Sequence, residues 1–242
     1  MAKITFFELE PWEKKYLARK LKGHQLKFVD APVSASTAAD AGGAEIVGCF
    51  IYSKIGPKEL ARWPKVKMIT TLSTGYDHID LAACAKKGVK VCYVPSYGSH
   101  TVAEHALALM LALSKKIIES AEHTRQGNFS LEGLRTFDLE DKTLGLIGFG
   151  KIGSHLAKTA KALGMHVRVY DPHADANLIE LLTCKSVSLD ELLRVSDVIS
   201  LHCNLTPENT HMINAAAIAK MKKGVIVINT ARGGLIDNKA LV

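Results

Sequence analysis

The residues best suited to chemistry lie in one stretch, LGLIGFGKIGSHLAKTAKALG, which spans residues 144–164. Gly148, Gly150 and Gly153 stand in G-x-G-x-x-G spacing, with an apolar run before them and apolar residues at helical period after them. A glycine turn between a strand and a helix predicts a phosphate site, because backbone amides and the positive end of the helix dipole face an anion there.

Each glycine meets a steric demand of such a turn. Gly148 allows the tight bend, Gly150 lets a pyrophosphate approach the backbone, and Gly153 lets the helix pack closely on the strand. Asp171 follows 18 residues after the third glycine, where a carboxylate accepts hydrogen bonds from ribose hydroxyls. The same charge repels a 2′-phosphate, so we expect NAD rather than NADP, a preference that a cationic His173 would soften.

A second candidate is Arg232, which VIVINTARGG places just beyond the carboxyl end of a buried strand. Ligands of open α/β sheets bind at that edge. The planar guanidinium binds a carboxylate through two parallel hydrogen bonds and polarises an adjacent carbonyl. Taken alone, the residue fits a surface loop arginine equally well.

Composition narrows the class of protein. The length of 242 residues, of which 48% are apolar, is enough for one large or two modest domains. The formal charge of the chain is +7. No run of Lys or Arg exceeds two residues, so we expect anionic cofactors and carboxylate substrates rather than nucleic acid. The five cysteines are scattered, and no signal peptide or membrane-length run is present, which favours a cytoplasmic protein with reduced thiols, no metal site and no membrane association.

The order of the elements predicts an α/β protein with two doubly wound parallel-sheet domains. Residues 1–100 form the first, residues 101–141 an interdomain helix and connection, and residues 142–242 the dinucleotide-binding domain. The helix should begin at Thr101 in a capping box with Glu104 and, being apolar on most faces up to Leu113, should be buried between layers or domains. Strands are expected at residues 3–9, 26–30, 45–52, 66–73, 89–94, 143–148, 166–171, 185–189, 197–203 and 224–231.

Taken together, these motifs resemble the D-2-hydroxyacid dehydrogenase family. The match rests on GFGKIG, Asp171, LHCNLTPENTHMIN, NTARGGLID, LSTGYDHID and VPSYGSHTVAEHALALMLAL, and it covers essentially the whole chain. ELEPWEKKYL and CFIYSKI resemble the D-lactate dehydrogenase branch. The resemblance implies a flavodoxin-like substrate domain, a Rossmann NAD-binding domain, reduction of a small 2-oxo acid such as pyruvate with NAD as cofactor, and a homodimer.

The resemblance also implies residue roles. Arg232 would be catalytic, with His202 behind it, although a satisfied core histidine is the open alternative there. The substrate residues would be Thr74 and Gly75, whose amides hold the carboxylate, and Tyr52 and Tyr97, which close the pocket around a small side chain. The cofactor residues would be Gly148, Gly150, Lys151, Ile152, Gly153, Asp171, His202, Cys203, Asn204, Asn209, Thr230, Ala231 and Arg232.

The chain departs from the family's pattern in two places. Asn204 stands where the family usually has a proline that fixes the backbone against the cofactor. The family's catalytic histidine and its glutamate lie beyond the NTARGG segment, and none of the ten histidines matches that position before Val242. We therefore expect a fragment of a longer enzyme, or a truncated gene, with an incomplete NAD-binding domain and weak or no turnover.

Two other functions stay open. One is a non-catalytic NAD-sensing protein, like the corepressors built on this fold. The other is a dehydrogenase for a different D-2-hydroxy acid, including a phosphorylated one or phosphite. A phosphate would need extra basic residues around Tyr52 and Tyr97, and Lys54 is the only one near in sequence.

Overall fold

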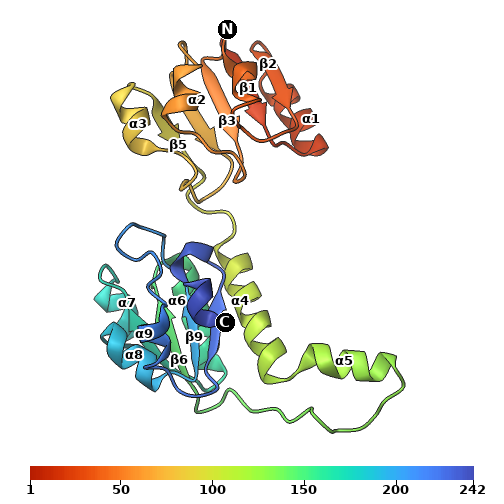
Figure 1. Ribbon diagram of the computed structural model, residues 1–242, viewed down its shortest axis with the longest axis vertical. Helices are drawn as coiled ribbons and strands as arrows, with labels where there is room; N and C mark the ends of the chain where they lie inside the picture. The colour runs from red at the N-terminus through yellow and green to blue at the C-terminus, as the bar shows by residue number, and fades with distance from the viewer. The chain divides into compact units, whose positions relative to one another are not determined.

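The computed structural model describes all 242 residues, Met1–Val242. They form two compact units, Met1–Tyr97 and Gly98–Val242 (Figure 1). Each unit contains a five-stranded sheet in which every pairing is parallel. The expected α/β class with two doubly wound parallel sheets is therefore confirmed.

The first sheet has the strand order β2-β1-β3-β4-β5, which is the flavodoxin-like order with a topological switch point between β1 and β3. Its strands are β1 Lys3–Phe7, β2 Gln25–Val29, β3 Ile46–Cys49, β4 Met68–Thr71 and β5 Lys90–Cys92. The helices between them are α1 Pro11–Lys20, the 3₁₀ helix η1 Ala38–Ala41, α2 Pro57–Ala61 and α3 Leu81–Lys86.

Trp63 lies in the larger of the two hydrophobic cores of this unit. Its side chain is fully buried, and its indole Nε1 donates a hydrogen bond to the carbonyl oxygen of Ala38 at 2.7 Å. A smaller core of Ile4, Phe6 and Leu9 packs separately, where the ring of Phe6 occupies the space that a Cβ on Gly48 would need. The apolar runs of the sequence are thus buried within a three-layer arrangement.

The second sheet has the strand order β10-β9-β6-β7-β8. Counted from β8, with β6 as strand 1, the order is 3-2-1-4-5, which is part of the Rossmann order. Its switch point lies between β6 and β9. Its strands are β6 Thr143–Ile147, β7 His166–Tyr170, β8 Lys185–Ser186, β9 Val198–Leu201 and β10 Ile226–Asn229. The helices of this unit are α4 Ser99–Ser114, α5 Ile117–Arg125, α6 Lys151–Ala162, α7 Ala176–Leu181, α8 Leu189–Val195, α9 Ala215–Ile218, η2 Gly233–Leu235 and α10 Asn238–Leu241.

The long helix α4 differs from expectation at its start. It begins at Ser99 with Gly98 as N-cap and has no side-chain cap. The expected Thr101–Glu104 capping box is wrong, because Thr101 already lies inside the helix. Only one face is buried, in the core of the second unit, while Leu109 and Leu113 are exposed. Burial between layers is confirmed for one face, and burial of the other faces between domains stays a prediction.

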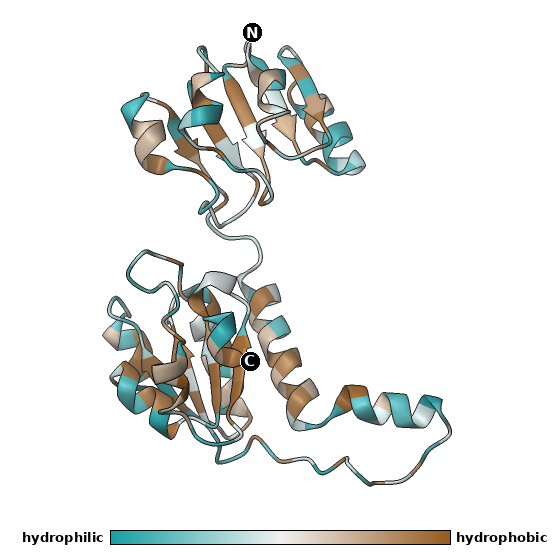
Figure 2. Cartoon of the chain, viewed as in Figure 1, coloured by the Kyte–Doolittle hydropathy of each residue, from teal (hydrophilic) through white to brown (hydrophobic).

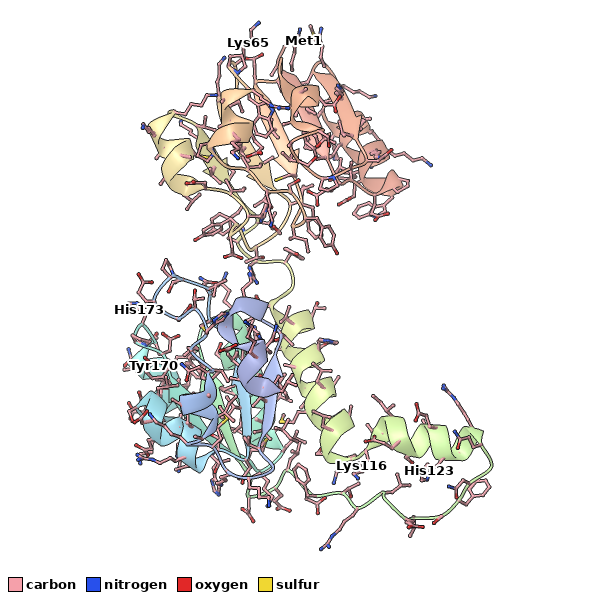
Figure 3. The ribbon with its side chains drawn as sticks, viewed as in Figure 1. Met1, Lys65, Lys116, His123, Tyr170 and His173 are labelled. Carbon is pink, nitrogen blue, oxygen red and sulfur yellow. The ribbon has the colours of Figure 1, made fainter.

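Residues 101–141, expected to hold one long helix and a connection, contain a further helix, α5. Lys116 adopts a left-handed conformation with φ 48° and separates α5 from α4. Figure 3 labels Lys116 at this corner and His123 on α5, and no residue of α5 is buried. Contacts of α4 with α6 and β10 place residues 98–141 in the second compact unit, whereas the sequence reading treats 101–141 as a segment apart.

Hydropathy follows this architecture. Figure 2 shows apolar residues along the central strands and along α4, with polar residues over most of α5. None of the helices is long and apolar enough to span a lipid bilayer.

Candidate functional site

The glycine turn joins β6 to α6 and is packed against the end of β9. Gly148 has φ +97°, and a Cβ there would lie 2.6 Å from the backbone nitrogen of Cys203. A Cβ on Gly153 would lie 2.3 Å from the carbonyl oxygen of Gly148. Both glycines are therefore required by close approach of the protein's own backbone.

Gly150 differs, because nothing lies within 4 Å of the place where its Cβ would be. It is exposed and forms the N-cap of α6, whose first turn begins with Lys151 and Ile152. The amides of a first helical turn have no acceptor within the helix. The open space above Gly150 and the amides of Lys151 and Ile152, here called the glycine cradle, fits the pyrophosphate of a dinucleotide.

Asp171 stands beside this turn, although it follows β7. Its carboxylate accepts hydrogen bonds from the backbone nitrogen of Phe149 at 2.7 Å and from that of His173 at 2.8 Å. Figure 3 labels Tyr170 and His173 on either side of it in the chain. A carboxylate has about four acceptor sites, so two amides hold Asp171 in place and leave capacity for ribose hydroxyls.

His202 lies at the switch point, directly after β9. Its Nε2 is 2.9 Å from the hydroxyl oxygen of Ser200, whereas its buried Nδ1 has no hydrogen-bond partner. Burial lowers the pKa of His202 to about 4, so the ring is neutral near pH 7. The alternative of a satisfied core histidine stays open, because Ser200 pairs one ring nitrogen and the other has no partner within the protein. Ser200, which the sequence reading passes over, is the partner that orients the ring.

The loop after His202 is folded by Asn209. Its side-chain nitrogen donates to the carbonyl oxygen of Asn204 at 2.7 Å, and its side-chain oxygen accepts from the backbone nitrogen of Thr206 at 2.7 Å. Burial raises the pKa of the Cys203 thiol, which keeps it protonated near neutral pH. Asn204 is exposed. Asn209 therefore shapes the loop that carries Cys203 and Asn204.

The end of β10 presents Thr230, Ala231 and Arg232 at the same sheet edge. Asn229 shapes this turn, since its side chain accepts from the Ala231 nitrogen at 3.0 Å and donates to the Arg232 carbonyl oxygen at 2.9 Å. The guanidinium of Arg232 donates to the Ala231 carbonyl oxygen at 2.9 Å. The buried hydroxyl of Thr230 has no partner. The sequence analysis did not single out Asn229, although an asparagine two residues before Ala231 is a typical turn-forming signal.

These features fit a dinucleotide. The cradle above Gly150 has room, the first turn of α6 supplies amides, and two buried polar atoms, Thr230 Oγ1 and His202 Nδ1, lack partners inside the protein. Buried polar groups are costly unless paired, and a bound ligand is one means of pairing them. No group of three or more His, Cys, Asp or Glu side chains is placed to hold a metal ion.

The predicted substrate residues lie in the first unit. The loop with Tyr52 follows β3 and the Thr74–Gly75 turn follows β4, so both stand at the carboxyl edge of the first sheet. Ser73 shapes the turn, because its hydroxyl lies 2.6 Å from that of Thr71 and donates to the Gly75 carbonyl oxygen at 2.7 Å. Tyr97 is the last residue of the unit and is exposed.

The individual roles of all these residues stay predictions. Within the second unit the fold gathers the predicted cofactor residues at one sheet edge, and within the first it gathers Tyr52, Thr74 and Gly75. Ser73, Ser200 and Asn229 are the polar neighbours that sequence reasoning missed.

The comparison with known proteins decides the family. The family model described as "D-isomer specific 2-hydroxyacid dehydrogenase, NAD binding domain" matches residues 107–242. The chain belongs to this family. Its NAD-binding domain, with the glycine cradle and Asp171, identifies NAD as the cofactor.

Individual relatives agree with this assignment. The D-lactate dehydrogenase of Escherichia coli (strain K12) is 40% identical over 244 residues, which cover 99% of this chain and 74% of that protein. A 2-hydroxyacid dehydrogenase homolog of Zymomonas mobilis is 41% identical over 223 residues, covering 91% of this chain and 67% of that protein. A D-lactate dehydrogenase from Aquifex aeolicus, solved with NAD and lactic acid, superposes with a TM-score of 0.94 at 39% identity, covering 98% of this chain and 72% of that one.

The different surroundings of Gly150 and Gly153 predict opposite effects of alanine. Gly150→Ala should leave folding intact, because its φ of −73° suits any residue and the space is open, but should weaken NADH binding about tenfold or more. Gly153→Ala should lower the free energy of unfolding by about 1–3 kcal/mol, since the new methyl group meets a backbone oxygen. Titration calorimetry with NADH and urea unfolding measure the two effects, and equal behaviour of both variants would contradict the assignment of the cradle.

The lowered pKa of His202 predicts a dependence of stability on pH. An unfolded histidine titrates near 6.5, so between about pH 6.5 and 4 the unfolded chain binds a proton that the folded chain excludes. The free energy of unfolding should fall as pH drops through this window, and His202→Asn should reduce that fall by about 2–3 kcal/mol. Urea unfolding at pH 7 and pH 4.5 measures this, with exposed His105→Asn as the control. An unchanged pH slope in His202→Asn would contradict burial of a neutral ring.

Proposed function

We propose that this chain catalyses the NAD-dependent reduction of a small 2-oxo acid to the D-2-hydroxy acid, and that pyruvate is its preferred substrate. The observation that carries the proposal is the position of Arg232, at the same sheet edge as the glycine cradle and next to the unpaired hydroxyl of Thr230. The similarity to D-lactate dehydrogenases supports pyruvate among the 2-oxo acids.

In this proposal NADH, when bound, supplies the hydride. Arg232 polarises the C2 carbonyl and stabilises the charge that develops on its oxygen, which then takes a proton from solvent. The Thr74 and Gly75 amides bind the carboxylate, and Tyr52 and Tyr97 limit the size of the side chain. The Asn229 hydrogen bonds to Ala231 and Arg232 hold the arginine turn in one conformation before the substrate arrives.

We also propose that residues 1–242 bind both ligands but turn over slowly. His202 is neutral, and its pKa of about 4 makes it a poor proton donor near pH 7. A reaction without an efficient general acid is slower by about 10²–10⁴-fold. The cytoplasmic location stays a prediction from the cysteine pattern.

A homodimer is part of the proposal. The helices α4 and α5 expose four apolar side chains, Leu109, Leu113, Ile117 and Ile118, with exposed fractions of 37, 53, 51 and 62%. Phe129 and Leu131 in the following segment are more than 80% exposed. Apolar patches of this kind mark interaction surfaces, and a second copy of the chain would cover them.

Substitution of Arg232 tests the proposed reaction. NADH oxidation with pyruvate should be detectable but slow in the wild type and should yield D-lactate. Arg232→Lys should lower kcat/KM for pyruvate by about 10²-fold or more, because lysine cannot form the bidentate, planar contact. Arg194→Lys on α8 is a matched control. A rate unaffected by Arg232→Lys, or L-lactate as product, would refute the proposed reaction.

Sedimentation tests the homodimer. The wild type should sediment as a dimer, and Ile118→Asp should shift it towards the monomer, because a charge buried without a partner is costly. Glu119→Gln, on the same helix, should leave the mass unchanged. A wild-type protein that stays monomeric at micromolar concentration would contradict the proposed interface.

A further inference from the structure

Glu8 is the first residue after β1, and its backbone is unusual. It has φ +63°, in the left-handed region that residues other than glycine seldom adopt. Its backbone nitrogen donates to the Val29 carbonyl oxygen at 3.1 Å, which ties it to the end of β2. Strained residues of this kind persist where the surrounding structure requires them, often at functional sites. The reason lies in the side chain.

The carboxylate of Glu8 receives four hydrogen bonds from the loop that follows β3. The backbone nitrogens of Phe50, Tyr52 and Ser53 donate to it at 3.1, 2.8 and 3.1 Å. The hydroxyl of Ser53 donates as well, while its oxygen accepts from the Val33 nitrogen at 2.9 Å. Hydrogen bonds to an ionised acceptor are stronger than neutral ones, so one carboxylate fixes the backbone of residues 50–53.

This loop stands where the fold favours ligand binding. The strand order places β1 beside β3 at the switch point of the first sheet, and ligands of such sheets bind outside the carboxyl ends of the strands there. Ile51 and Tyr52 are exposed, at 46 and 73%, while Ser53 is fully buried. The loop is therefore held from its inner side by Glu8 and presents Tyr52 outward.

Backbone hydrogen bonds connect the segment after β3 to the segment after β4. The Leu72 nitrogen donates to the Cys49 carbonyl oxygen at 3.0 Å, and the Ile55 nitrogen donates to the His78 carbonyl oxygen at 2.9 Å. Burial and the charge of Glu8 raise the pKa of Cys49 to about 12, which agrees with a partly buried carboxylate close to the end of β3. A shift of the Glu8 loop would thus reach the segment that carries Thr74 and Gly75.

We propose that Glu8 is a positioning residue that fixes the loop of residues 50–53 and so determines which 2-oxo acid side chains Tyr52 admits. The inference rests on the proposed function, because it takes Tyr52 to face the substrate. Glu8 itself touches no substrate. It acts by keeping three amides and one hydroxyl of the loop directed inward, where water would otherwise compete for them.

The test compares two substrates by binding, so that slow turnover does not interfere. Dissociation constants of pyruvate and of the bulkier 4-methyl-2-oxopentanoate are measured by calorimetry on the full chain saturated with NAD⁺. The wild type should favour pyruvate. Glu8→Gln should weaken pyruvate binding about tenfold and reduce the ratio of the two constants several-fold, because a loosened loop both misplaces contacts and admits a larger side chain. NAD⁺ affinity should not change.

Two further variants separate positioning from simple stability. Ser53→Ala removes one of the four donors and should alter the ratio in the same direction, by less; it decides the question if Glu8→Gln does not fold. Glu45→Gln is the control, because Glu45 also binds a backbone nitrogen, that of Lys3, and the ammonium of Lys67, but near the amino ends of the strands. It should lower the unfolding midpoint without changing the ratio.

The outcomes are distinct. If the wild type discriminates and both Glu8→Gln and Ser53→Ala discriminate equally well, the role of Glu8 is refuted while the proposed function stands. If the wild type binds neither oxo acid, the proposed function fails and the role of Glu8 fails with it. A ratio that changes in Glu45→Gln as much as in Glu8→Gln also refutes positioning, because general destabilisation would then explain both.

Discussion

The cofactor site depends on the close approach of three backbone segments at Gly148. The turn after β6, the start of α6 and the end of β9 meet with no room for a Cβ at Gly148 or Gly153. This contact aims the first turn of α6 at the open side of Gly150 and sets His202 and Cys203 beneath the turn. Because backbone atoms rather than mobile side chains make the contact, the amides that bind an anion are held rigidly in advance.

Side-chain hydrogen bonds to the backbone extend this rigidity to the loops. Asp171 binds the Phe149 amide, Asn209 folds the loop after His202, and Asn229 fixes the turn before Arg232. In the first unit, Glu8 and Ser73 do the same for the loops after β3 and β4. Each of these five loops at the carboxyl edge of a sheet thus has a polar residue that organises its backbone, and residues expected to meet ligands lie close to it.

The two units hold the loops at the carboxyl edges of their sheets by different means. The second uses glycine where backbones must touch, in addition to the Asp171 carboxylate, whereas the first uses the Glu8 carboxylate to hold the loop after β3. A glycine turn is fixed by sterics and tolerates no added atom. A carboxylate with four donors is fixed by electrostatics, so its loop keeps its shape only while the charge and the donors remain together. The first arrangement suits a cofactor with an invariant pyrophosphate, and the second suits a site that must distinguish related substrates.

The sequence by itself determined the features that neighbouring residues encode. Strands lie within or close to the expected ranges, because short apolar runs broken by turns and helices specify buried parallel strands. The glycine spacing located the turn before α6, and the motif order indicated the family. Only the tertiary structure revealed α5, the start of α4 at Ser99 and the hydrogen bonds of Glu8 to the loop after β3. Glu8 and Tyr52 are 44 residues apart, and a hydrogen bond over that separation leaves no periodic trace, since it exists only once β1 and β3 lie side by side.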